Sequence, residues 1–236
     1  MQAIILAGGR GTRLQPYTTV LPKPLMPVGN YPILEIVIRQ LHYAGFRQIL
    51  MAVGYLGELI EAYLGDGSKW GVEILYSRED EPLGTAGPVA LFDGLQEHFL
   101  VMNGDILTDL DYTAFFEYHQ KKEGLATIAT YEKKVKIDLG VIETGPNGQL
   151  TKYIEKPVLP YSVSMGIYAF ARQILSHIPI GQYLDFPDLI KKLITAEKPV
   201  YSMPFDGYWL DIGRREDYEE AAEDFAELEK QFLKEK

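Results

Sequence analysis

The sequence predicts an α/β fold with a mostly parallel central sheet covered by helices on both faces. Short apolar segments of strand length alternate with segments of helical periodicity through the first half of the chain. The 236 residues are 47% apolar and 12% aromatic, which is enough to fill a core. Because no repeat, linker or low-complexity segment interrupts the pattern, we expect one compact unit over 1–236.

The first half begins with a buried strand over Gln2–Ala7, which leads into a glycine-rich loop. A helix is predicted from near Tyr31, with Asn30 as its N-cap, Pro32 in its first turn and Gly45 after its end. Its apolar residues recur at helical spacing at Ile33, Leu34, Val37, Ile38 and Leu41. The next elements are a strand over 47–53, a helix over 56–64, strands over 72–77 and 99–102, a helix over 113–123 and a strand over 126–131. This alternation predicts parallel strands with helices on both faces.

The pattern changes after residue 131. Two segments, 136–143 and 150–154, flank the turn Pro146-Asn147-Gly148 and predict a hairpin. The later elements are a strand over 163–170, helices near 171–177 and 186–195, strands over 200–205 and 208–210, and a charged helix from Arg214 to the end. We therefore expect a Rossmann-like three-layer α/β/α architecture whose central sheet is mixed.

Composition excludes several classes of protein. The chain has no cysteine, which rules out disulfides, thiolate nucleophiles and cysteine-based metal sites. Its apolar segments are too short to span a bilayer, and residues 1–7 lack the features of a signal peptide, so we expect a cytoplasmic protein without a membrane partner. The formal net charge of -10 argues against a nucleic-acid partner, although a local cationic site can still bind a small anion.

The most informative segment is residues 1–34, which contain no Asp or Glu. Arg10, Arg13 and Lys23 stand around a loop whose glycines are Gly8, Gly9 and Gly11. Glycine lets the backbone approach an anion closely, and consecutive amides can then bind its oxygens. This combination indicates a polyphosphate site, and an ordinary glycine-rich turn with solvated arginines is the alternative for the loop alone.

The loop differs from two common nucleotide-binding motifs. No Gly-Lys-Ser/Thr closes it as in a Walker loop, and Leu14 stands where a dinucleotide fingerprint needs its third glycine. Lys23 lies between Pro22 and Pro24, which restrict the backbone on either side of a single positive charge.

Six motifs occur in order along almost the whole chain. They are residues 6–14 (LAGGRGTRL), Pro22-Lys23-Pro24, residues 82–87 (PLGTAG), Asn103-Gly104-Asp105, Glu155-Lys156-Pro157 and Trp209-Leu210-Asp211-Ile212-Gly213. Each is weak alone, but the ordered set resembles the sugar-1-phosphate nucleotidylyltransferases, also called NDP-sugar pyrophosphorylases. The resemblance implies a fold of the nucleotide-diphospho-sugar transferase type. It also implies a nucleotide-binding half near 1–131 and a sugar-phosphate half near 132–236. We expect no C-terminal left-handed β-helix, because no hexapeptide repeats follow Asp211.

The resemblance also implies roles for individual residues. Arg13, Lys23, Asp105 and Asp211 are the expected catalytic group, with Arg13 on the departing pyrophosphate and Lys23 near the reacting α-phosphate. The expected nucleotide-binding residues are Leu6, Ala7, Gly8, Gly9, Gly11, Thr12, Arg13, Glu81, Gly84, Thr85, Asn103 and Asp105, of which Glu81, Gly84 and Thr85 stand where the family reads the base. The expected sugar-phosphate residues are Gly140, Glu155, Lys156, Ser164 and Gly166. Asp105 and Asp211 are the expected ligands of Mg²⁺, which commonly takes one or two carboxylates plus phosphate oxygens and water.

The substrates are less defined than the family. Thr85-Ala86-Gly87 after Gly84 is similar to guanylyltransferases that act on mannose 1-phosphate or heptose 1-phosphates, so GTP is favoured. UTP ranks second, followed by CTP or dTTP, because thymidylyltransferases tend to carry a Gln before the base pocket. Analogy with the family further suggests a homodimer.

Two other functions fit parts of the sequence. A non-catalytic relative that senses an NDP-sugar would keep the fold, although the presence of Arg13, Lys23 and Asp211 favours turnover. A GT-A glycosyltransferase would use an Asp-x-Asp metal motif, which Asp109-Leu110-Asp111 matches, but this string precedes a predicted helix and is more typical of an N-cap. The four histidines lack metal-ligand spacing, so we expect them to have packing or surface roles.

Overall fold

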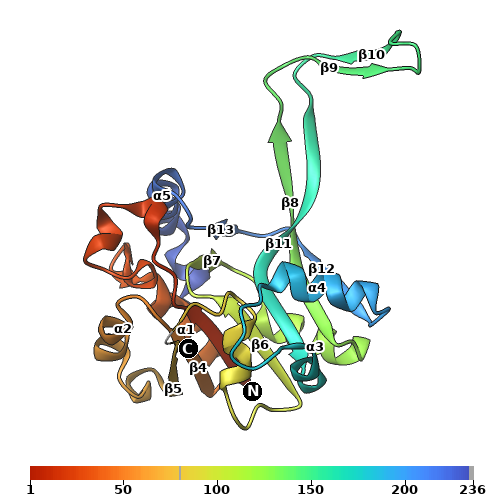
Figure 1. Cartoon of the computed structure of the whole chain (residues 1–236). Coiled ribbons are helices and arrows are strands. Elements are labelled where there is room, and N and C mark those ends of the chain that lie inside the picture. The colour runs from red at the N-terminus through yellow and green to blue at the C-terminus, as the bar shows by residue number, and fades with distance from the viewer. Residues whose placement is uncertain (80, 234–236) are drawn as a thin grey trace.

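The computed structural model describes residues 1–79 and 81–233, and a seven-stranded sheet runs through its centre (Figure 1). The strand order is β12-β8-β11-β6-β1-β4-β5. Within this sheet β11 runs antiparallel to both of its neighbours, β6 and β8, whereas the other neighbouring pairs are parallel. The predicted mostly parallel mixed sheet is therefore confirmed.

The elements have the following bounds. The central strands are β1 (Gln2–Ala7), β4 (Gln48–Val53), β5 (Glu73–Arg78), β6 (His98–Asn103), β8 (Ala126–Lys136), β11 (Val158–Ala171) and β12 (Val200–Phe205). Three antiparallel pairs lie outside this sheet: β2 (Pro27–Val28) with β3 (Tyr31–Pro32), β7 (Ile106–Thr108) with β13 (Trp209–Asp211), and β9 (Val141–Thr144) with β10 (Leu150–Ile154). The helices are α1 (Ile33–Tyr43), α2 (Gly57–Leu64), α3 (Tyr112–Lys122), α4 (Phe186–Thr195) and α5 (Arg215–Phe232).

Apolar side chains on both faces of the sheet attach the helices to it. On one face, residues of β1, β4 and β6 pack with α1, α2 and α3 through side chains such as Val37, Ile60 and Phe115. On the other face, α4 packs through Leu189 and Leu193. The three-layer arrangement thus follows from apolar positions at helical spacing on each helix. A third cluster attaches α5 to the β2–β3 region and the turns after β1.

Several predicted boundaries are wrong for identifiable reasons. Helix α1 begins at Ile33 with Pro32 as its N-cap, because Tyr31 and Pro32 are extended and pair with β2. The helix predicted near 171–177 is a 3₁₀ helix over Arg172–His177. The strand predicted to end at residue 131 continues to Lys136, and the hairpin strand β9 begins only at Val141. The predicted end of the last helix includes residues 234–236, which lie outside the described residues.

Strands β8 and β11 extend well beyond the rest of the sheet and carry the β9–β10 hairpin at their far end (Figure 1). We call residues 132–163 the arm. Strand β12 pairs with β8 only up to Tyr131, and β6 pairs with β11 only from Ile167 onward. The arm therefore projects from the body as a two-stranded ribbon. Among the helices of the described chain, none combines the length and apolar character needed to cross a bilayer.

Candidate active site

Four side chains from distant parts of the chain meet beyond the carboxyl end of the central strands. Arg13 lies in the 3₁₀ turn Thr12–Leu14 after β1, and Lys23 begins another turn, Lys23–Leu25. Asp105 follows β6, and Asp211 is the last residue of β13. Open α/β sheets bind their ligands at this edge. The fold thus places two cations and two carboxylates where ligands usually bind in such sheets.

Lys23 and Asp105 form an ion pair between Nζ and Oδ2. Lys23 is only 8% exposed, so its charge is held in place by the surrounding chain rather than by solvent. The other carboxylate oxygen of Asp105, Oδ1, is buried and has no hydrogen-bond partner among the described residues. Buried acceptors normally have a partner, so this oxygen is available to a water or a cation.

Asp211 lies in the electric field of the same group. Asp211 is exposed to solvent, but part of its carboxyl surroundings is protein. Desolvation raises its pKa, the negative charge of Asp105 raises it further, and the charges of Lys23 and Arg13 oppose this rise. The backbone segments that carry Asp105 and Asp211 are also hydrogen-bonded, because the Ile212 amide donates to the Asp105 carbonyl at 3.2 Å. The Arg13 guanidinium lies against Gly213, since a Cβ placed on that glycine would be 3.4 Å from Nη2.

The residues present suit a hard divalent cation. No group of three or more His, Asp or Glu side chains within 1–79 and 81–233 could hold a metal ion alone. Two carboxylates with one unpaired oxygen nevertheless match the partial ligand set that Mg²⁺ takes when substrate phosphates and water complete its shell.

The glycine loop presents free backbone donors beside this group. In the described structure the amides of Gly9, Arg10 and Gly11 donate to no protein acceptor. Gly11 has φ +59°, and a side chain there would meet Thr18 at 2.9 Å, so glycine is required. The space above Gly9 is open, with no heavy atom within 4 Å of a Cβ placed there. These features suit the close approach of an anion.

A second loop lies across from the glycine loop and contains Gly84 and Thr85. The Thr85 amide donates to Asp185 Oδ1 at 2.9 Å, and the Thr85 hydroxyl accepts from the Phe186 amide at 2.8 Å. Gly84 has φ +76°, and a Cβ there would be 2.6 Å from the Leu184 carbonyl oxygen. Hydrogen bonds therefore attach this loop to the start of α4, which lies about 100 residues later in the chain. Glu81, which precedes the loop, is exposed.

Glu79 is a site residue that sequence reasoning missed. Its Oε2 accepts from the Leu83 amide at 2.7 Å, while its Oε1 lies over the glycine loop, 3.3 Å from a Cβ placed on Gly8. Partial burial raises its pKa. The carboxylate thus bridges the two loops and keeps one oxygen directed at the space between them. The sequence feature that could have indicated Glu79 is its position just after β5, because β5 and β1 end at the same edge of the sheet.

The residues expected to bind the sugar phosphate fall into two groups. In the first group, Gly166 lies beside Asn103: it has φ +73°, and a Cβ there would be 2.7 Å from Asn103 Nδ2. The Gly166 amide donates to the Ser164 hydroxyl at 3.3 Å. Close by, the Trp209 indole donates to the Met165 carbonyl at 3.1 Å, and its ring lies 5.3 Å from that of Tyr131.

The second group lies on the arm. Gly140 packs against the Tyr153 hydroxyl, which donates to Glu155 Oε2 at 3.0 Å, and Lys156 is exposed with φ +46°. Strand β11 begins at Val158, and Val158 to Ser164 alone covers roughly 20 Å of extended chain. The structure therefore does not bring Gly140, Glu155 or Lys156 to the group formed by Asp105 and Asp211.

The remaining candidate residues have structural partners. Asp111 caps α3 by accepting from the Ala114 amide at 2.9 Å, as predicted, and Asp109 accepts from the Tyr208 amide at 2.8 Å. The rings of His98 and His119 contact each other edge to face. These partners argue against a metal site at Asp109-Leu110-Asp111.

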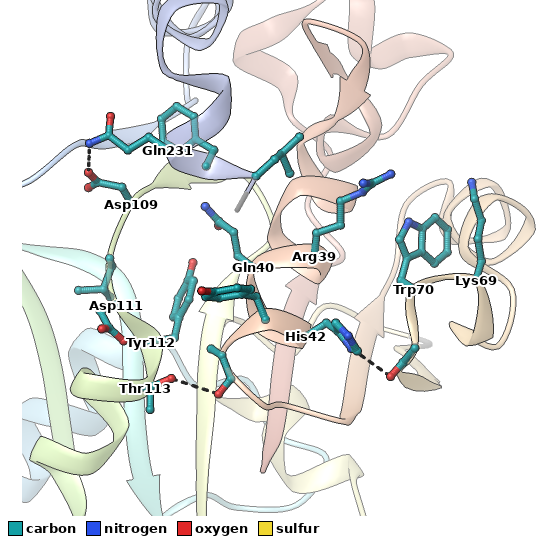
Figure 2. Close-up of a pocket in the computed structure, with 16 residues that line it drawn as sticks. Arg39, Gln40, His42, Lys69, Trp70, Asp109, Asp111, Tyr112, Thr113 and Gln231 are labelled. Atoms are coloured by element: carbon teal, nitrogen blue, oxygen red, sulfur yellow. Dashed lines mark hydrogen bonds between the residues drawn. The ribbon is translucent and has the colours of Figure 1, made fainter. Parts of the chain in front are cut away.

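A cavity of about 910 Å³ opens elsewhere on the molecule, between the end of α1, the start of α3 and the end of α5 (Figure 2). Gln40, Trp70 and Tyr112 are among its lining residues, and Gln231 donates across its edge to Asp109 at 3.0 Å. None of the residues predicted for the active site lines it. The cavity is therefore separate from the candidate active site.

The fold and site define an α/β protein with two cations, two carboxylates and a glycine loop at one edge of its central sheet. Residues 2–227 match the family model described as nucleotidyl transferase, and the chain belongs to this family. It is 36% identical over 241 residues to a UTP–glucose-1-phosphate uridylyltransferase of Synechocystis, covering 94% of this chain and 62% of the relative. It is also 36% identical over 231 residues to the catalytic subunit beta of mannose-1-phosphate guanylyltransferase of Danio rerio, covering 92% and 62%.

Solved structures agree with this assignment. A Bacillus anthracis protein assigned as a glucose-1-phosphate thymidylyltransferase and solved with sucrose matches with a TM-score of 0.78 at 25% identity, covering 98% of each chain. HddC from Yersinia pseudotuberculosis matches with a TM-score of 0.74 at 25% identity, covering 95% of this chain and 99% of that one. The present chain spans about three fifths of the length of the curated relatives named above.

Proposed function

We propose that this protein transfers a nucleotidyl group from a nucleoside triphosphate to a sugar 1-phosphate and releases pyrophosphate, with Mg²⁺ as its cofactor. The observation that carries the proposal is the meeting of Arg13 and Lys23 with Asp105 and Asp211 beside a glycine loop with free amides. The names of the uridylyltransferase and guanylyltransferase relatives support the same reaction class.

The chemistry requires positive charge more than covalent help. A phosphate oxygen of the sugar phosphate forms a bond to the α-phosphorus, and the bond between that phosphorus and the bridging oxygen of pyrophosphate breaks. Both substrates are anions, so their repulsion must be offset before they can approach. Lys23 holds charge near the α-phosphate, Arg13 stabilises the leaving pyrophosphate, and the amides around Gly9 bind the phosphate oxygens. Mg²⁺, when bound by Asp105 and Asp211, supplies further positive charge to the phosphates.

The sugar-phosphate side of the proposal combines both groups of residues described above. Ser164 and Gly166 line the sugar pocket near Asn103. Glu155 binds sugar hydroxyls and Lys156 binds the sugar phosphate, which requires the arm residues to lie closer to the catalytic group in the substrate complex. A cytoplasmic homodimer completes the proposal, by analogy with the family.

We propose GTP as the preferred nucleotide and mannose 1-phosphate or a related sugar 1-phosphate as the acceptor. Guanine presents two adjacent donors, N1–H and the 2-amino group, whereas uracil and thymine present one N–H between two carbonyl oxygens. A carboxylate oxygen such as Glu79 Oε1 accepts from the former and repels the latter. The other Glu79 oxygen is already held by the Leu83 amide, which fixes the direction of the free one. UTP is the alternative substrate, as the uridylyltransferase relative suggests.

Pyrophosphate release from four nucleoside triphosphates against several sugar 1-phosphates tests this function. We expect turnover that needs both substrates and is fastest with GTP. Glu79→Gln keeps the shape of the side chain but removes the charge, so the ratio of kcat/KM for GTP over UTP should fall about tenfold. An unchanged ratio would show that Glu79 does not read the base. Lack of turnover with every pair would favour a protein that only senses NDP-sugars.

A further inference from the structure

The start of α4 departs from the usual pattern of helix capping. Asp185 occupies the N-cap position, where an Asp side chain normally accepts a hydrogen bond from one of the first amides of its own helix. In the described chain its carboxylate makes no such bond. The Thr85 hydroxyl instead accepts from the Phe186 amide at 2.8 Å. A residue that suits capping but does not cap its own helix indicates another role for its side chain.

The Asp185 carboxylate is bound to the loop that contains Gly84 and Thr85. We call residues 83–87 the base loop. Oδ1 of Asp185 accepts from the Thr85 amide at 2.9 Å and from the Thr85 hydroxyl at 3.2 Å, and Oδ2 accepts from the Tyr183 hydroxyl at 2.7 Å. Burial raises the pKa of Asp185, but the hydrogen bonds from Tyr183 and Thr85 outweigh burial and leave the pKa below its ordinary value. Asp185 therefore holds the loop as an ionised carboxylate at neutral pH.

These bonds leave the base loop with a single free backbone donor. The other amides of the loop donate to protein acceptors, which are Glu79 for Leu83, Asp185 for Thr85, and the Leu184 carbonyl for both Ala86 and Gly87. Only the Gly84 amide has no acceptor among the described residues. A Cβ on Gly84 would be 2.9 Å from Asp185 Oδ1, so the carboxylate lies directly behind this donor.

The anchor itself is fixed in the core. Phe186 is 1% exposed, and its ring centroid lies 4.5 Å from that of Tyr168 on β11. Leu189 and Leu193 attach the rest of α4 to the sheet. Groups held by packed helices and strands keep their geometry better than groups on free loops. Asp185 therefore ties the base loop to a rigid part of the fold.

We infer that Asp185 is a positioning residue for nucleotide recognition, which holds the base loop so that the Gly84 amide alone is free to donate to a nucleobase. The inference rests on the proposed nucleotide site and extends it to a residue that acts through the loop. Discrimination between bases depends on a few hydrogen bonds of fixed direction. A loop released from its anchor should therefore bind different bases with more similar affinities.

Removing the anchor tests this role. Isothermal titration calorimetry with GTP, UTP, CTP and dTTP, with Mg²⁺ and without sugar phosphate, gives the affinity of each nucleotide. In Asp185→Ala the affinity for the nucleotide that the wild type binds best should fall about tenfold, and its preference over the next nucleotide should fall at least about threefold. Asp185→Asn keeps an acceptor for the Thr85 amide, so both values should stay within about threefold of the wild type.

Two further variants separate positioning from a general effect on the helix. Asp188→Ala removes the same charge from the first turn of α4, where Asp188 is exposed and pairs with Lys191 at 3.1 Å, and it should change neither value by more than about twofold. Tyr183→Phe removes the donor to Asp185 Oδ2 from a side chain that is 64% exposed, so it leaves the core intact. It should lower the preference in the same direction, by about twofold to threefold. Circular dichroism verifies that each variant is folded.

Three results would overturn the inference: an unchanged preference in Asp185→Ala, an equal loss in Asp188→Ala, or an equal weakening of all four nucleotides, which would mean a purely structural tie. Pyrophosphate release from the same preparations keeps this inference separate from the proposed activity. A wild type that binds nucleotide without turnover would refute the activity and leave the binding test valid. An active enzyme whose nucleotide preference is indifferent to Asp185→Ala would do the reverse.

Discussion

Lys23 shows how its surroundings fix the position of a charged side chain. The prolines on either side restrict its backbone, burial of its side chain limits its motion, and the pair with Asp105 directs its Nζ into the site. A lysine is a compact point charge, so its effect on a phosphate depends on this placement. Asp105 contributes through its second oxygen, which is buried and unpaired in the described structure.

Arg13 is the residue whose removal should affect the reaction itself. Its guanidinium is exposed beside Gly213 and faces the field of Asp211 and Lys23. Arg13→Ala removes charge from the leaving pyrophosphate, so kcat should fall by about 10²–10³ while the KM for sugar phosphate changes little. Steady-state kinetics with each substrate varied in turn measure both quantities. Unchanged kcat would contradict the role assigned to Arg13.

Sequence reasoning named the four charged side chains that lie together in the structure, but it did not name Glu79. Glycines beside cations and carboxylates after apolar segments were visible as local patterns, and they meet in the structure. Glu79 was missed because a single Glu after a strand looks like any surface carboxylate. Only the fold shows that one of its oxygens contacts the loop at Leu83 and the other contacts the glycine loop at Gly8.

Elements whose periodicity is strong were predicted well. Helix α4 and strand β12 have the predicted bounds, because their apolar positions face a single layer. The β7–β13 pair could not be predicted, since each strand has only three residues and its partner lies about 100 residues away. The length of the arm was also not predicted, because the lysines of β8 interrupt the alternation of apolar and polar residues that indicates a strand.

At the scale of an element, we predict that an arm lysine affects the KM of only one of the two substrates. Lys156→Ala should raise the KM for sugar phosphate about tenfold or more and leave the KM for the nucleotide unchanged, because it removes one charge–phosphate contact. Lys152→Ala is a matched control, since Lys152 is an exposed arm lysine that pairs with Glu143 at 3.2 Å. An effect confined to the nucleotide, or equal effects of both variants, would mean that the two halves are assigned incorrectly.

At the scale of the whole molecule, a buried histidine links stability to pH. His119 is fully buried, its ring contacts His98 and Thr127, and burial followed by repulsion from His98 lowers its pKa to about 4. An unfolded histidine titrates near about 6.5. Below that pH the unfolded chain binds a proton that the folded chain does not, so stability falls as the pH drops toward 4.

This linkage should amount to about 3 kcal/mol between pH 7 and pH 4. Urea denaturation across this range measures it. In His119→Gln the pH-dependent loss should shrink by about that amount, whereas His177→Gln, at a partly exposed position, should keep the wild-type slope. Equal slopes in the wild type and His119→Gln would show that another group causes the acid sensitivity.

The central claim is that fixed cations and a divalent ion, held by carboxylates from distant segments, bring two anionic substrates together in one cleft. The most direct measurement is pyrophosphate release from GTP and mannose 1-phosphate, with and without Mg²⁺, for wild type, Asp105→Asn and Asp211→Asn. We predict turnover in the wild type that needs Mg²⁺ and falls at least about 10²-fold in either variant. Wild-type rates in both variants, or full turnover in excess chelator, would contradict the claim.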